Sequence, residues 1–151
     1  MANLNLAQVI GYLGDDCTRS NKGITTLPNG DVKYTFSIAT SDKWKDKITG
    51  EPRSNTEWHK IETILKSTTP QGAHKYLEDT LKKGFLTEVR GKMRSSKYQL
   101  EDGIDRVKHY IEVNRMAGGA IQCLERRGAV VTGTSETQTN SEEELEDNIA
   151  F

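Results

Sequence analysis

The sequence predicts a small all-β domain with a single helix, followed by an acidic tail. Three observations support this prediction. Apolar and polar residues alternate in several segments, as they do in half-buried strands. One segment instead repeats its apolar residues at helical spacing. From Gly128 onward the chain has six acidic residues and no basic residue. With 151 residues, of which 34% are hydrophobic, the chain has room for one ordinary domain and a tail.

The first strand is expected at residues 3–13. It ends near Gly11 and Gly14, and glycines within a strand indicate a bulge or a close backbone approach. Residues 15–31 are polar and are expected to form a loop. This loop closes with Pro28-Asn29-Gly30, a sequence that favours a turn.

Two long strands are expected on either side of a turn near Gly50. Residues 32–39 alternate between apolar and polar side chains with a period of two. Residues 55–66 form the returning strand, with Trp58 and Lys60 on one face and His59 on the other. Each of the two tryptophans, Trp44 and Trp58, lies in a lysine-rich part of this unit.

A helix is expected after this hairpin, followed by two more strands. Thr69 is a candidate N-cap, Pro70 suits the first helical position and Gly84 suits a C-terminal cap. Residues 85–95 and 107–116 are expected to be strands, joined by a turn at residues 101–103. Three strands, a helix and two strands follow the order of an OB-fold, a five-stranded Greek-key barrel.

Charge divides the chain into two parts. Residues 1–127 carry a net charge of +5, and residues 128–151 carry −6. We therefore expect a barrel domain at 1–127, a disordered linker at 128–144 and an acidic protein-interaction tip at 145–151. A basic domain with an acidic tail points to nucleic acid or a regulated partner, although a domain of this charge can also be merely soluble.

Aromatic residues among cations suggest a binding surface. Bases stack on aromatic rings while lysines contact phosphates, and each stacked base contributes roughly 1–3 kcal/mol. The alternative is that Trp44 and Trp58 both belong to the core, where most tryptophans lie. A core tryptophan is rarely flanked by two lysines, as Trp44 is by Lys43 and Lys45, so we favour base stacking.

Catalysis is not expected. Glu57 and His59 share a strand face, but Glu62 lies on the opposite face, so these groups do not converge on a metal. The three histidines lack the spacing of metal ligands, and no phosphate-binding loop or nucleophile motif occurs. We therefore expect no enzyme, no cofactor and no metal. No apolar run could span a membrane and no secretory signal is present, so the expected compartment is the bacterial cytoplasm.

Several segments resemble the bacterial single-stranded DNA-binding protein family, whose members are homotetramers of OB-folds. The most specific match comprises Ile38-Ala39-Thr40-Ser41, Trp44-x-Asp46-x-x-Thr49-Gly50-Glu51 and Thr56-Glu57-Trp58-His59. Weaker matches follow in the right order at Tyr76-Leu77, at residues 90–98 and at Asp147-Asn148-Ile149-Ala150-Phe151. The resemblance covers about residues 6–118 and the last few residues.

The resemblance implies that the chain binds and protects single-stranded DNA, with little sequence specificity, during replication, recombination and repair. It also implies a homotetramer with His59 in the subunit contacts, a location at the nucleoid, and recruitment of replication and repair proteins through the tip. The expected DNA-binding residues are three aromatic ones for stacking and seven cations for phosphates: Trp44, Trp58, Tyr98, Lys43, Lys45, Lys60, Arg90, Lys92, Arg94 and Lys97. The expected partner-binding residues are Asp147, Ile149 and Phe151.

Two departures from the family pattern indicate a divergent member. Ile64 stands where a fourth stacking aromatic residue is usual, and Ala150 stands where the tip usually has proline. Because isoleucine has no π-face, one stacking contact of roughly 1–3 kcal/mol is expected to be weakened. The alternative function is that of an OB-fold RNA-binding protein or a primosome-type interaction module.

Overall fold

The computed structural model describes residues 2–126. The predicted linker and tip, and with them Asp147, Ile149 and Phe151, lie outside the described residues. The described elements are strands, one α-helix and a short 3₁₀ turn: β1 (Ala7–Leu13), β2 (Ile24–Thr26), β3 (Val32–Lys45), β4 (Pro52–Leu65), α1 (Gln71–Thr80), β5 (Leu86–Gln99), β6 (Asp105–Val113), η1 (Arg115–Ala117) and β7 (Ala120–Glu125).

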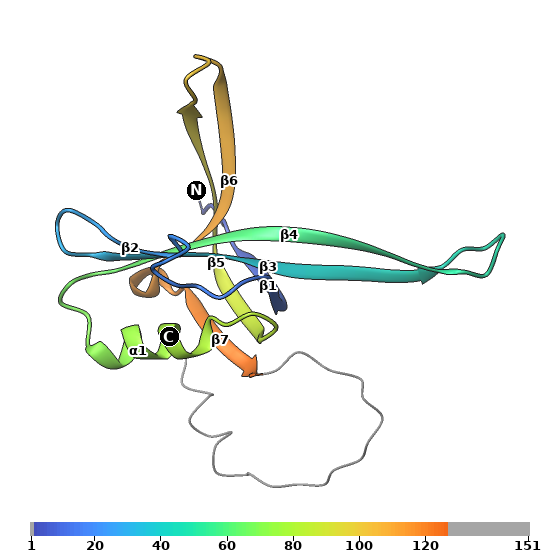
Figure 1. Ribbon diagram of the computed structural model, residues 1–151, viewed down its shortest axis with the longest axis horizontal. Helices are drawn as coiled ribbons and strands as arrows, with labels where there is room; N and C mark the ends of the chain where they lie inside the picture. The colour runs from blue at the N-terminus through green and yellow to red at the C-terminus, as the bar shows by residue number, and fades with distance from the viewer. Residues whose placement is uncertain (1, 127–151) are drawn as a thin grey trace, which may run out of the picture.

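Five of the strands close into a barrel (Figure 1). Their order is β1, β3, β4, β6 and β5, and β1 also pairs with β5, which completes the ring. β4 and β6 run parallel, whereas the other four pairings of the ring are antiparallel. In the sequence, α1 lies between the third and fourth barrel strands. The predicted five-stranded OB-fold barrel with one helix is therefore confirmed.

Two short strands were not predicted. β2 pairs with β3 within the segment expected to be a loop, and β7 pairs with β5 after the last expected strand. β2 has only three residues, too few for a period to be recognised. β7 pairs with a strand far earlier in the chain, and no local pattern reveals such a partner.

The helix ends differ from the prediction. Pro70, not Thr69, occupies the N-cap position, and no side chain caps the helix there. Leu81 is the C-cap, so the predicted cap at Gly84 is wrong. Gly84 instead has a φ of 82°, and its N–H donates to the carbonyl of Leu13 at 2.9 Å. The left-handed glycine thus turns the chain from the helix back into the sheet beside β1.

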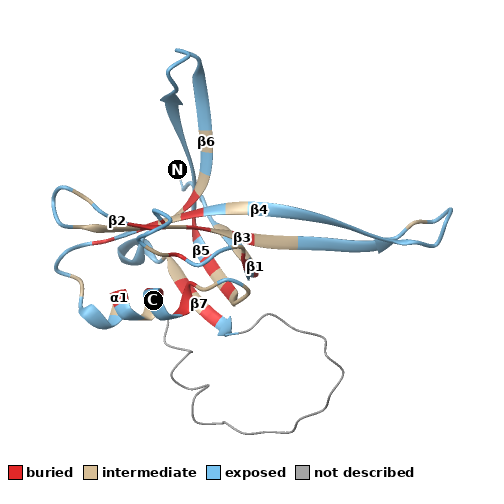
Figure 2. Ribbon diagram, in the orientation of Figure 1, coloured by how far each residue is buried: buried red, intermediate tan, exposed pale blue. Residues whose placement is uncertain are grey.

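The core fills the barrel and continues beneath α1. Ile38, Ile61 and Val89 are fully buried, and Leu77 and Leu81 join the same cluster from the helical segment. Figure 2 shows the buried positions gathered where the strands cross, while the ends of the long hairpins are exposed. Apolar burial of this kind is the main source of stability for the barrel.

Gly11 and Gly91 permit very close backbone contacts within the barrel. A Cβ atom at Gly11 would lie 2.1 Å from the carbonyl oxygen of Ala39, and one at Gly91 would lie 2.3 Å from that of Glu112. No side chain fits in such a gap, so the strands could not approach each other if either residue were larger. The close backbone approach predicted near Gly11 is confirmed.

Two hairpins extend outward beyond the barrel. β3 and β4 stay paired as far as Lys45 and Pro52, and β5 and β6 stay paired as far as Gln99 and Asp105. We call their outer parts the β3–β4 arm and the β5–β6 arm. In Figure 1 the two arms project from the barrel in different directions. Their exposed side chains are therefore available for contacts outside the fold.

Candidate nucleic-acid interface

The outward-facing side chains of four strands form a surface that we call the outer face. We assign residues to this face from the strand registers, because directly paired residues lie on the same side of a sheet. It runs from β3 across β4 and β6 to β5 and includes Lys33, Thr35, Ser37, Ala39, Trp58, Lys60, Glu62, Ile64, Arg106, Lys108, Tyr110, Glu112, Lys92, Arg94, Ser96 and Tyr98. The surface combines aromatic rings with an excess of cations.

Trp58 is an exposed aromatic residue of this face. Its residue exposure is 61%, and its ring lies against Gly14, where a Cβ atom would be only 2.5 Å from the ring carbon Cζ3. The close approach expected at Gly14 therefore involves a side chain rather than backbone. The ring also lines an open cleft of about 600 Å³ with the loop that contains Asp15 and Asn21. Gly14 thus makes room for the ring at the edge of this cleft.

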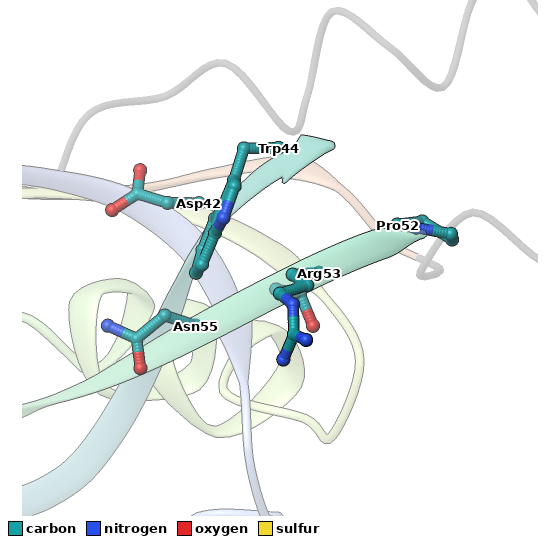
Figure 3. Close-up of a pocket in the computed structure, with 6 residues that line it drawn as sticks. Asp42, Trp44, Pro52, Arg53 and Asn55 are labelled. Atoms are coloured by element: carbon teal, nitrogen blue, oxygen red, sulfur yellow. The ribbon is translucent and has the colours of Figure 1, made fainter. Parts of the chain in front are cut away.

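Trp44 lies on the opposite face of the β3–β4 arm. The register pairs Trp44 with Arg53 but Trp58 with Ala39, and the alternation of a strand puts these two pairs on different sides. Trp44 is 50% exposed and lines an open recess of about 710 Å³ with Asp42 and Arg53 (Figure 3). Both tryptophans lie outside the core of the chain, so the alternative that they are core residues is wrong.

Asp46 holds the turn beyond Trp44. One of its carboxylate oxygens accepts hydrogen bonds from the backbone N–H groups of Ile48 at 2.8 Å and Thr49 at 3.3 Å. The other accepts from Nε of Arg53 at 2.9 Å. Hydrogen bonds from Ile48 and Thr49, and more weakly from Arg53, lower the pKa of Asp46 below its usual range. The charged carboxylate therefore keeps Arg53 beside Trp44 at neutral pH.

Tyr98 lies near the end of the β5–β6 arm and is 45% exposed. Two of the predicted phosphate-binding arginines on β5 also have acidic neighbours. Arg94 forms an ion pair of 3.7 Å with Glu112, and Arg90 forms one of 3.3 Å with Glu88. Both arginines are exposed, and exposed pairs of this kind contribute little energy. They leave the arginines able to exchange a carboxylate for a phosphate.

The structure brings some of the predicted DNA-binding residues together and separates others. By strand parity, the predicted cations on the same side as Trp58 or Tyr98 are Lys43, Lys45, Lys60, Arg90, Lys92 and Arg94. Trp44 and Lys97 lie on the opposite sides of their arms. The predicted residues thus surround the two arms instead of lining a single groove.

His59 and Ile64 occupy different sides of β4. His59 is half-buried, and its Nε2 atom lies 2.8 Å from Oγ1 of Thr40. Its role in subunit contacts remains a prediction. Ile64 is 51% exposed on the outer face and lines a recess of about 640 Å³ together with Tyr110. The position expected to be aromatic therefore faces outward, as a binding residue would, but presents an aliphatic side chain.

A cluster on the outer face was missed by the sequence analysis. It consists of Lys33, Glu62, Lys108 and Tyr110, and we call it the Glu62 cluster. Burial raises the pKa of Glu62, but hydrogen bonds and attraction from Lys33 and Lys108 outweigh this effect and lower the pKa overall. Alternation along β4 placed Glu62 opposite His59, as the structure shows. Its partners come from β3 and β6, however, and the register between strands is not visible in the sequence.

Within residues 2–126, no group of three or more His, Cys, Asp or Glu side chains could hold a metal ion. The described helix is too short and too polar to cross a membrane.

Residues 4–118 match the sequence model of the Single-strand binding protein family. The chain belongs to this family. Two relatives, both named Single-stranded DNA-binding protein, come from Neisseria meningitidis serogroups A and B, and each is 37% identical to the chain over 114 residues. The aligned segment is 76% of this chain and 59% of each relative. This member of the single-strand binding protein family therefore spans about three fifths of the length of those relatives.

A solved structure supports the same assignment. The chain is similar to one chain of the Plasmodium falciparum SSB complex with ssDNA, with a TM-score of 0.65 and 26% sequence identity. The match covers 83% of this single-strand binding family chain and 98% of the other. The resemblance stated from the tryptophan-containing segments, and the OB-fold that it implied, are both confirmed.

Proposed function

We propose that the chain binds single-stranded DNA with little sequence preference and protects it during replication, recombination and repair. The observation that carries this proposal is the exposure of Trp44 and Trp58, each beside basic side chains. An exposed ring stacks on any base, because every base has a π-face. Family membership and the names of the relatives support the same conclusion. The activity is one of binding, without catalysis or a cofactor, in the bacterial cytoplasm at the nucleoid.

The positions of the two rings constrain the path of a bound strand. Trp44 and Trp58 lie on opposite faces of the β3–β4 arm, so a strand that stacks on both must pass around the arm. Lys43, Lys45 and Lys60 lie on the Trp58 side, where they would meet phosphates. The cations of β5, namely Arg90, Lys92, Arg94 and Lys97, would extend the path toward Tyr98.

Titration with oligo-dT is expected to quench the tryptophan fluorescence and to saturate at a fixed number of nucleotides. The logarithm of the affinity should fall with the logarithm of the salt concentration by about 0.7 for each phosphate contact, because each contact releases counterions. Oligo-dA and mixed sequences should bind similarly, and a duplex of equal length is the control. Unchanged emission, with no binding of a labelled strand at low salt, would refute the proposal. Tighter binding of RNA than of DNA would favour the RNA-binding alternative.

The chain is further proposed to act as a homotetramer, as the family resemblance implies. β1 and the residues before it support self-association. Their outward-facing side chains Leu4, Leu6, Ile10 and Tyr12 are exposed, and we call them the β1 stripe. Gln8 lies between Leu6 and Ile10 and is also exposed, so the stripe is apolar on both sides of one polar residue. Exposed apolar patches are typical of protein–protein interfaces. His59 is proposed to contribute to the same assembly from β4.

The tip at residues 145–151 is proposed to recruit replication and repair proteins. Its support lies in the sequence, where Ile149 and Phe151 stand beside acidic residues such as Asp147. Replacing Ile149 and Phe151 together by alanine is expected to abolish the capture of partner proteins from a bacterial extract, while the affinity for oligo-dT stays the same. The matched control is Asn148→Ala. Equal capture by both variants would show that the tip is not the recognised segment.

A further inference from the structure

The Glu62 cluster occupies a central place on the outer face. Glu62 lies on β4 between Lys60 and Ile64, two residues along the strand in each direction and on the same side. Lys33 reaches it from β3, with Nζ 2.5 Å from Oε1, and Lys108 reaches it from β6, with Nζ 2.9 Å from Oε2. Each carboxylate oxygen is therefore engaged by one lysine. The Glu62 side chain is only 12% exposed, so this arrangement is screened less than a surface ion pair.

Tyr110 provides an aromatic ring in the same cluster. The Nζ atom of Lys108 lies 5.0 Å from the centroid of the Tyr110 ring, within the range of a cation–π contact. Tyr110, Glu62 and Ile64 line one recess of about 640 Å³, which also includes Met116 and Arg115. The recess thus combines an aromatic ring and an apolar wall with the carboxylates of Glu62, Asp31 and Glu112. Lys33 and Lys108 do not line it but stand beside it, because both pair with Glu62.

These groups match the parts of a nucleotide. A base can stack on the Tyr110 ring, and a phosphate can bind between Lys33 and Lys108. The recess also contains Ile64, which has no π-face of its own. Glu62 has the opposite effect, because its negative charge repels a phosphate and occupies both lysines. The cluster is therefore suited to hold a nucleotide, but with an affinity that the carboxylate reduces.

We propose that the recess and the lysine pair beside it form an additional nucleotide subsite, in which Tyr110 stacks on a base, Lys33 and Lys108 bind its phosphate, and Glu62 competes with that phosphate for the two lysines. The proposal rests on the single-stranded DNA binding proposed above. It assigns to Tyr110 the stacking contact that Ile64 cannot make.

The first test replaces the carboxylate. Glu62→Gln keeps the shape of the side chain but frees two lysines, so the variant should bind oligo-dT several-fold more tightly at low salt. Its salt dependence should become steeper by about 0.7–1.4 in slope, corresponding to one or two further phosphate contacts. The matched control is Glu78→Gln, which removes the same charge from exposed α1. If Glu62→Gln changes affinity and slope no more than Glu78→Gln does, the lysines do not contact the strand and the proposal fails.

The second test concerns the ring and does not depend on the first. Tyr110→Leu should weaken oligo-dT binding about five-fold or more, the lower end of one stacking contact, whereas Tyr110→Phe should retain the wild-type affinity. Circular dichroism melts of all variants establish that each is folded before its affinity is compared. Equal affinities for Tyr110→Leu and Tyr110→Phe would overturn the subsite. A wild-type chain that binds no single-stranded DNA would instead refute the proposed function itself.

Discussion

Replacing Trp44 and Trp58 together by leucine is expected to weaken the binding of oligo-dT by about 2–6 kcal/mol, which corresponds to roughly 30-fold to 10⁴-fold. Each ring is expected to contribute one stacked base. The two rings lie on opposite faces of the β3–β4 arm and share no contact, so their contributions should add. The two single variants should therefore each account for part of the loss, and their sum should match the double variant.

The measurement needs a signal from the DNA, because the double variant has no tryptophan left. Fluorescence anisotropy of a labelled oligo-dT strand is suitable. Both rings are at least half exposed, so the thermal unfolding of the variants should stay close to that of the wild type, which is the control for folding. If the double variant binds oligo-dT as tightly as the wild type, the two exposed rings do not stack on bases and belong to a different contact surface.

Replacing Ile10 by aspartate in the β1 stripe is expected to dissociate the proposed tetramer. An unpaired carboxylate buried in an interface costs about 3–5 kcal/mol, and a two-fold symmetric interface contains the substitution twice. The subunit itself should still fold, because Ile10 points outward and is exposed in the single chain.

Light scattering coupled to size-exclusion chromatography measures the outcome directly. The wild type should elute with the mass of four chains and Ile10→Asp with a smaller mass. Thr25→Asp is the matched control, because Thr25 is also an exposed strand residue but lies on β2, away from the β1 stripe. If Ile10→Asp remains tetrameric, the subunits associate through another surface. If the wild type is a monomer, the proposed tetramer is refuted.

The barrel could be predicted from the sequence because apolar and polar residues alternate clearly along its strands. The position of the helix between the third and fourth barrel strands also marks the OB-fold order. Residues such as Phe36 and Ile38 alternate with polar neighbours, and their burial follows directly from that period. β2 was missed because its three residues are too few to show a period, and β7 because it pairs with β5, a strand much earlier in the chain. The cap at Gly84 was misplaced because a glycine after a helix can serve the following turn as well as the cap.

The candidate site was predicted only in part. Alternation correctly separated Trp58 from His59, and the lysines beside Trp44 correctly indicated an exposed ring. The sequence could not show that the two tryptophans face opposite ways, because this depends on the register between β3 and β4. The Glu62 cluster was missed for a similar reason. Lys33, Glu62 and Lys108 come from three strands, and no sequence spacing connects them.

Closure of the barrel between β1 and β5 has a consequence for how the chain folds. The end of β1 pairs with β3 at Ala39 and Ile38, but Ala7 pairs with Gly91 of β5, which is synthesised only after more than half of the chain has followed. Pairing over such a sequence separation is slow, because the entropy of a long loop is lost before the contacts form. Until then the edge of β1 that pairs with β5 is unpaired in the nascent chain, and such edges are prone to aggregation. The stage between the synthesis of β1 and that of β5 is therefore when a growing chain is most exposed to misassembly with its neighbours.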